Sequence, residues 1–104
     1  MMEILQIVSE FKEKVSEKFG KVEVILFGSR ARDKAEEESD IDILVILDRD
    51  VDIKVRESIY DIAYELNLKY DVVLDVSVYS RVEWDRYREV LPFIINIEKE
   101  GVVV

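Results

Sequence analysis

The chain contains no cysteine and no histidine, and it has only three glycines and one proline among its 104 residues. Without cysteine it can form no disulfide, and without either residue it can form no Cys/His zinc site. The same two absences exclude thiol nucleophiles and every catalytic relay that depends on histidine. Any general base must therefore be an aspartate, glutamate, lysine or tyrosine.

Glycine is too sparse for the common nucleotide-binding loops. It occurs only at Gly20, Gly28 and Gly101, so neither the G-x-G-x-x-G dinucleotide fingerprint nor a Walker A loop can be written anywhere in the chain. If a phosphate-binding loop is present, it must be built on Gly28.

Positive charge is also in short supply. Lysine and arginine number 15 against 24 aspartates and glutamates, which gives a net charge of −9. Such a charge repels polyanions, so we expect no direct nucleic-acid binding.

No run of eighteen apolar residues and no export signal is present, which predicts a cytoplasmic protein without membrane contact. The length provides for one core, so we expect residues 1–104 to form a single domain.

Hydrophobic periodicity predicts alternating helices and strands. The expected helices cover residues 2–19, 30–35, 53–68 and 80–100, the last interrupted at Pro92, and the expected strands cover 22–27, 41–47, 72–79 and 102–104. A capping box at Ser80 and Glu83 marks the start of the last helical region. We expect an α/β fold with a small mixed β-sheet, helices packed mainly on one face, and the carboxylates on the other.

The strand 41–47 is apolar on both of its faces, which is typical of a central strand. Asp40 and Asp42 stand at its start and share a face with Leu44 and Ile46. Two carboxylates at the start of a buried strand are costly unless a cation lies between them. The pattern therefore predicts a metal site.

Residues i and i+2 of a strand are about 6.6 Å apart on one face, so Asp40 and Asp42 can converge on two cations about 3.5 to 4 Å apart. Oxygen ligands of this kind suit Mg²⁺ or Mn²⁺, which take further ligands from substrate phosphates. A nucleoside triphosphate such as ATP is the obvious phosphate donor. Asp75, on strand 72–79, would be the third carboxylate that the activation of an attacking hydroxyl requires.

The segment after Gly28 contains the candidate phosphate contacts. Gly28 allows a close backbone approach, and Ser29 at a helix start offers N–H groups and a hydroxyl. Arg30 and Arg32 add positive charge, although both could instead pair with acids on the surface.

Each motif alone is more often structural than functional, because Gly-Ser is usually a turn and Asp-x-Asp is usually a solvated strand end. Only their combination favours a site.

Gly28-Ser29, Asp40-x-Asp42 and Asp75 on a later strand together resemble the DNA polymerase β-type nucleotidyltransferase superfamily. Within it, GSRAR followed by SDIDILV most resembles the minimal nucleotidyltransferases, the MNT domains of HEPN/MNT toxin–antitoxin pairs. The resemblance implies that the three aspartates hold two metal ions and that Gly28 and Ser29 hold the triphosphate. It also implies an antitoxin that adenylylates a tyrosine of a partner HEPN ribonuclease toxin.

Two alternatives stay open at this point. The chain could be a non-catalytic antitoxin or nucleotide sensor that neutralises its partner by contact. Transfer to a small molecule is less favoured, because 104 residues leave little room for an acceptor domain. The apolar run 90–97 predicts that some of its residues, Phe93 and Ile97 among them, are buried against a second protein, either a copy of the chain or the toxin. We interpret Tyr60, Tyr64 and Tyr70 as packing residues, with stacking on the nucleotide base as the less favoured alternative.

Overall fold

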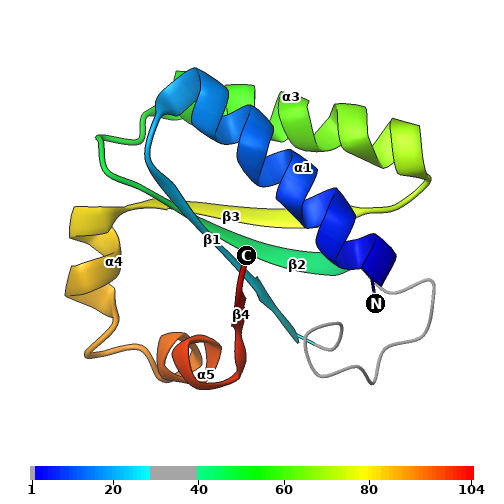
Figure 1. Cartoon of the computed structure of the whole chain (residues 1–104). Helices are drawn as coiled ribbons and strands as arrows, with labels where there is room; N and C mark the ends of the chain where they lie inside the picture. The colour runs from blue at the N-terminus through cyan, green and yellow to red at the C-terminus, as the bar shows by residue number, and fades with distance from the viewer. Residues whose placement is uncertain (1, 29–39) are drawn as a thin grey trace.

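The computed structural model describes residues 2–28 and 40–104 (Figure 1). The elements in chain order are α1 (Met2–Phe19), β1 (Val22–Phe27), β2 (Ile41–Leu47), α3 (Ile53–Tyr70), β3 (Leu74–Ser80), α4 (Arg81–Tyr87), α5 (Pro92–Glu100) and β4 (Val102–Val103). All predicted elements within the described residues are confirmed, including the interruption before Pro92. The predicted helix over 30–35 lies outside the described residues. None of the described helices combines the length and the apolarity that crossing a membrane requires.

The four strands form one mixed sheet in the order β3-β2-β1-β4. β1 runs antiparallel to both β2 and β4, whereas β2 and β3 are parallel. The parallel pair is joined by α3, as a parallel connection requires a crossover. β2 is therefore a central strand, as its two apolar faces predict.

The sheet has helices on both faces, but the two long ones share a face (Figure 1). α1 and α3 cover the face of β2 that carries Ile41, Ile43 and Val45, and they form the larger core with it. The opposite face is covered in part by α4 and α5, where Trp84, Ile94 and Ile97 pack on Ile25, Leu44 and Ile46. The predicted mixed sheet with helices mainly on one face is thus confirmed. The second, smaller helical layer is an addition to it.

Side chains of α3 bind the backbone of β3. Asp71 caps the C-terminus of α3 in the left-handed conformation, at φ 54° and ψ 50°. The Asn67 side chain then accepts a hydrogen bond of 2.9 Å from the Leu74 N–H, and Arg56 donates one of 2.7 Å to the Val78 carbonyl. These two bonds satisfy one N–H and one carbonyl on the outer edge of β3, the edge strand of the sheet.

The prediction for the apolar run 90–97 is wrong for Ile97. Ile94 and Ile97 are 0% and 6% exposed and are buried by the chain's own sheet. The short helix turns both side chains inward, because positions three residues apart share a face. Val90, by contrast, is 67% exposed. The side chains of Phe93 and Ile95 lie outside the described residues.

Candidate active site

The sheet register brings two of the three predicted carboxylates together. Asp42 is the second residue of β2, and it pairs with Asp75 of β3 on one side and with Phe27 of β1 on the other. Directly paired residues on neighbouring strands direct their side chains to the same face. Asp42 and Asp75 therefore lie side by side on the face that α4 and α5 only partly cover.

Gly28 follows β1 and lies against Asp42. Its φ is +76°, a conformation that only glycine adopts readily. A Cβ atom at this position would collide with Asp42 Oδ2 and lie 3.1 Å from Asp42 Cγ. The first demonstrable role of Gly28 is thus to make room for the carboxylate. Its predicted approach to a phosphate is compatible with this arrangement.

The electrostatics of the pair are those of crowded acids. Burial raises the pKa of Asp42, and the neighbouring charges of Asp75 and then Asp40 raise this pKa further, together with a hydrogen bond between the Asp42 and Asp75 side chains. Each cause disfavours the ionised form of Asp42. These carboxylates therefore concentrate negative charge at the start of β2 and β3.

Asp40 lies just before β2 and is exposed, close enough for its charge to act on Asp42. In the described residues, however, no three acidic side chains converge closely enough to count as a metal-binding group. Ser29, Arg30 and Arg32 lie outside the described residues. The structure therefore brings Gly28, Asp42 and Asp75 together and leaves Asp40 at their margin.

The donor atoms fit a hard divalent cation. Asp42 and Asp75 offer only carboxylate oxygens, which Mg²⁺ and Mn²⁺ prefer. These two residues would hold the ion, and Asp40 would complete the set. Two protein carboxylates leave coordination positions for substrate oxygens, as in enzymes that bind nucleotides through Mg²⁺.

Ser77 was not singled out from the sequence. It pairs with Leu44, two positions along from the Asp42–Asp75 pair, and it is half-buried. Because residues two apart in a strand share a face, Ser77 adds a hydroxyl to the same surface as Asp75. The alternating faces of strand 72–79 already indicate that Ser77 lies on the same face as Asp75.

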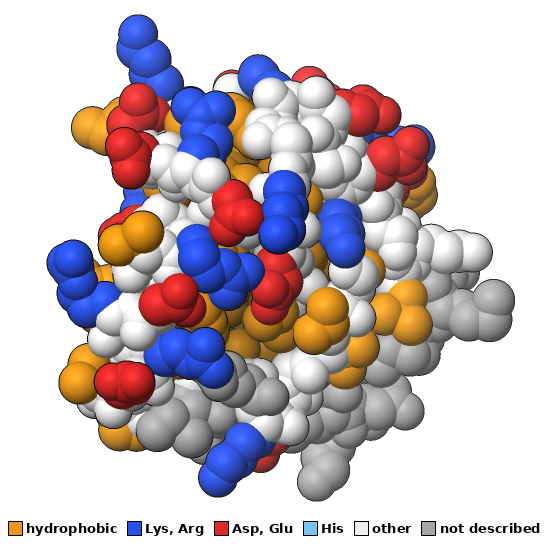
Figure 2. Space-filling model, turned by 60° about the vertical axis from the view of Figure 1, so that its left-hand side comes forward, with side chains coloured by type: hydrophobic (Ala, Val, Ile, Leu, Met, Phe, Trp, Pro, Cys, Tyr) orange, Lys and Arg blue, Asp and Glu red, His pale blue; other side chains and the backbone are white. Residues whose placement is uncertain are grey.

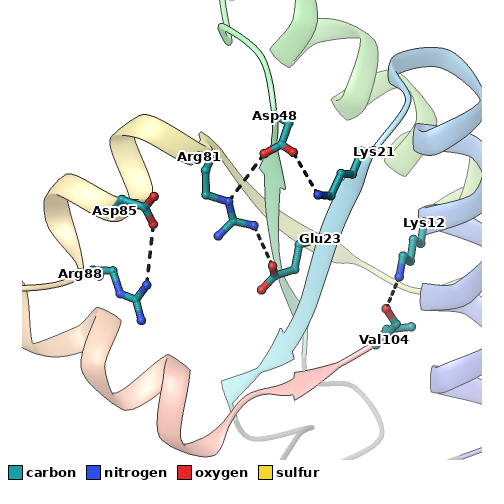
Figure 3. A network of polar contacts seen from close by, with 8 residues as sticks. All are labelled: Lys12, Lys21, Glu23, Asp48, Arg81, Asp85, Arg88 and Val104. Atoms are coloured by element: carbon teal, nitrogen blue, oxygen red, sulfur yellow. Dashed lines mark hydrogen bonds and ion pairs between the residues drawn. The ribbon is translucent and has the colours of Figure 1, made fainter.

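A second polar cluster lies on the same sheet face at the other end of β1 and β2 (Figure 3). Arg81, the first residue of α4, binds Glu23 at 2.7 Å and approaches Asp48 at 3.8 Å, and Lys21 lies 3.5 Å from Asp48. Figure 2 shows positive and negative side chains interspersed on this face of the molecule. Because these charges are mutually paired, the cluster ties α4 to the sheet and offers no excess charge to a ligand.

Comparisons with known proteins identify the family of the chain. The model of the nucleotidyltransferase domain family matches residues 8–104. A relative from Methanocaldococcus jannaschii, named "Putative protein adenylyltransferase MJ0141", is 36% identical over 99% of this chain and 100% of its own. The protein adenylyltransferase MntA of Thermococcus cleftensis is 34% identical over 86% of this chain and 91% of its own.

Solved structures share the fold. A nucleotidyltransferase crystal structure from Sulfolobus solfataricus, itself named putative, superposes with a TM-score of 0.61 at 26% identity, covering 98% of this chain and 79% of that one. A toxin–antitoxin complex with AMP-PNP gives a TM-score of 0.56 at 20% identity, covering 90% and 69% respectively. The family match over residues 8–104 and the identity to these relatives define the class as nucleotidyltransferase. The chain belongs to the nucleotidyltransferase domain family and is an enzyme of that class.

Proposed function

We propose that the chain transfers AMP from ATP to a tyrosine hydroxyl of a partner HEPN ribonuclease toxin, and that it acts as the antitoxin of that partner. The observation that carries the proposal is the β2–β3 register, which sets Asp42 against Asp75 beside Gly28. The names of the relatives, protein adenylyltransferases, support the reaction, and the toxin–antitoxin complex of similar fold supports the kind of partner.

In the proposed reaction, the tyrosine oxygen attacks the α-phosphorus of ATP. A new P–O bond forms to the tyrosine, the bond to the bridging oxygen breaks, and pyrophosphate leaves. Asp75 receives the proton of the attacking hydroxyl, since the chain has no histidine that could act as base. A bound divalent cation would supply charge neutralisation at the phosphate oxygens.

Asp40, Asp42 and Asp75 would hold the divalent cation in this proposal, with Asp75 also next to the attacking hydroxyl. Gly28 and Ser29 receive the triphosphate through backbone N–H groups, and Arg30 and Arg32 add charge next to it. We also propose that two Mg²⁺ ions take part, and that residues 1–104 act as one domain in the cytoplasm.

The test uses the purified chain, the purified protein encoded beside it, Mg²⁺ and ATP labelled at the α-phosphate. Label should move to the neighbour in the presence of wild type and should stay in ATP with Asp42→Asn. Asp50→Asn, which neutralises an exposed carboxylate outside the site, is the matched control and should transfer normally.

A tyrosine-to-phenylalanine series in the neighbour then identifies the acceptor. If every such variant still takes up label, the tyrosine assignment is wrong. Neutralisation of the neighbour without any transfer of label would instead establish the contact-only antitoxin.

A further inference from the structure

The outer face of α3 is unusually apolar for a surface helix. Val55, Ile59, Ala63 and Leu66 pack inward. On the opposite side, four large apolar residues are exposed, with exposed fractions of 73% for Ile53, 44% for Tyr60, 57% for Tyr64 and 70% for Leu68. Their spacings of seven, four and four residues align them along one line of the helix. The interpretation of Tyr60 and Tyr64 as packing residues is therefore wrong in this chain.

Acidic side chains accompany this line of residues, which we call the α3 stripe. Glu57, Asp61 and Glu65 are exposed and lie between the stripe residues along the helix. Near its start Lys54 is exposed, and Arg56 is engaged by the Val78 carbonyl. Near its end Lys69 is engaged by Glu10 at 3.1 Å. The surface therefore combines aromatic and aliphatic contacts with net negative charge.

That combination determines what can cover the stripe. Tyrosine and leucine side chains exposed in a row are typical of a protein-binding surface. A second copy of this chain would bring an identical acidic face to it, which like-charge repulsion disfavours. A complementary partner instead presents an apolar groove with lysine or arginine side chains at its sides.

The α3 stripe also leads towards the active site. α3 ends two residues after Leu68, and the chain then enters β3, whose start lies at the same end of the sheet as the start of β2 (Figure 1). Val73, 54% exposed, precedes Asp75 by two residues and so lies on its face of the strand. α3 covers the sheet face opposite Asp75, so a protein bound along the stripe would have to extend around the edge strand β3 to reach this residue.

We infer that the α3 stripe is the docking surface for the protein that accepts the nucleotide, and that this protein binds it through an apolar groove flanked by basic residues. The inference rests on the proposed function, because it assigns the substrate's binding surface for that reaction.

The test measures transfer and binding separately, using the purified neighbouring protein as the probe. The double variant Tyr64→Glu/Leu68→Glu should raise KM for the neighbour at least tenfold, as is typical of central interface residues, and should leave kcat unchanged. Val82→Glu, which alters a 68% exposed valine of α4, is the matched control and should behave as wild type. Equal unfolding midpoints of the variants establish that both are folded.

A second arm tests the charge. The triple variant Glu57→Gln/Asp61→Asn/Glu65→Gln should slow association with the neighbour and reduce its dependence on salt. The matched control is a triple variant at exposed acids elsewhere, Glu13→Gln/Glu17→Gln/Asp50→Asn. It should leave the association rate and its salt dependence unchanged.

Failure of the inference is distinguishable from failure of the proposed function. If wild type transfers AMP and the stripe variants show wild-type KM, the docking assignment is overturned while the reaction stands. If wild type neither binds nor labels the neighbour, the proposed function fails. A dimer of the chain alone that Tyr64→Glu/Leu68→Glu dissociates would assign the stripe to self-association and would also overturn the inference.

Discussion

The Asp42 carboxylate occupies the space into which a side chain at position 28 would project. Gly28 has a φ of +76°, and a Cβ placed on it would collide with Asp42 Oδ2. The position of the Asp42 carboxylate thus requires a glycine at position 28. A change at either position alters the space available to the other.

Gly28→Ala should consequently destabilise the chain and impair transfer together. A left-handed backbone costs a non-glycine residue about 1–2 kcal/mol, and the collision with Asp42 adds to this cost. Chemical denaturation of the single variants and of Gly28→Ala/Asp42→Ala measures the coupling. Because the second substitution removes the colliding carboxylate, the double variant should be less destabilised than the two single effects added together. Simple additivity would contradict the described contact.

Asn67→Ala tests what holds β3 in register. Removing the side chain leaves the Leu74 N–H without its partner, which should cost about 1–3 kcal/mol. The hydrogen bond fixes the start of β3, so transfer should fall more than nucleotide affinity does. Asn67→Asp, which keeps an acceptor oxygen, is the matched control. Wild-type stability for Asn67→Ala would mean that α3 does not set the position of Asp75 through this bond.

Glu10 links α1 to α3 and provides a pH-dependent contribution. Hydrogen bonds from Tyr70, at 2.5 Å, and then from Lys69 lower the pKa of Glu10. A lowered pKa stabilises the fold at neutral pH, and the gain is lost as the pH falls through the pKa of the folded state. Glu10→Gln should therefore be slightly less stable than wild type at pH 7 and equal to it in strong acid. A difference that grows in acid would contradict this account.

Particular residues show how far the sequence determines the fold and the site. The apolar run 41–47 predicts a central strand because burial on both faces excludes polar residues, and the alternation of strand 72–79 places Asp75 on a definite face. The register that sets Asp75 against Asp42 depends on Asn67 and the turn at Asp71, which periodicity does not encode. The collision that requires Gly28 likewise depends on the antiparallel partner strand.

Two misinterpretations have a common physical cause. Periodicity identifies an apolar residue but not what buries it, since core and interface are equally apolar along a helix. Ile97 was therefore assigned to a second protein and is in the core, whereas Tyr64 was assigned to packing and is 57% exposed. The phosphate contacts expected at Ser29, Arg30 and Arg32 remain predictions.

Arg32→Ala is expected to weaken the binding of triphosphate more than that of monophosphate, because a guanidinium next to the loop would contact the outer phosphates. Isothermal titration with a non-hydrolysable ATP analogue and with AMP, both with Mg²⁺, measures the difference. Equal losses for the two nucleotides, or no loss, would remove Arg32 from the site.

The stability of Asp42→Asn without ligand separates a functional from a structural carboxylate. Because burial and the nearby acids raise the pKa of Asp42, its ionisation destabilises the folded state increasingly as the pH rises above about 4. Asp42→Asn removes the charge, so without metal it should be at least as stable as wild type at pH 7. In acid the advantage should disappear, because wild-type Asp42 is then protonated in both states.

The most direct measurement is the unfolding free energy of wild type and Asp42→Asn, each with and without Mg²⁺ and a non-hydrolysable ATP analogue. Wild type at a hundred times the dissociation constant should gain about 2.7 kcal/mol by mass action. The variant should keep its stability without ligand and gain almost nothing from it. An equal gain in both proteins, or a variant that is markedly destabilised without ligand, would contradict the assignment of Asp42 to a metal–nucleotide site.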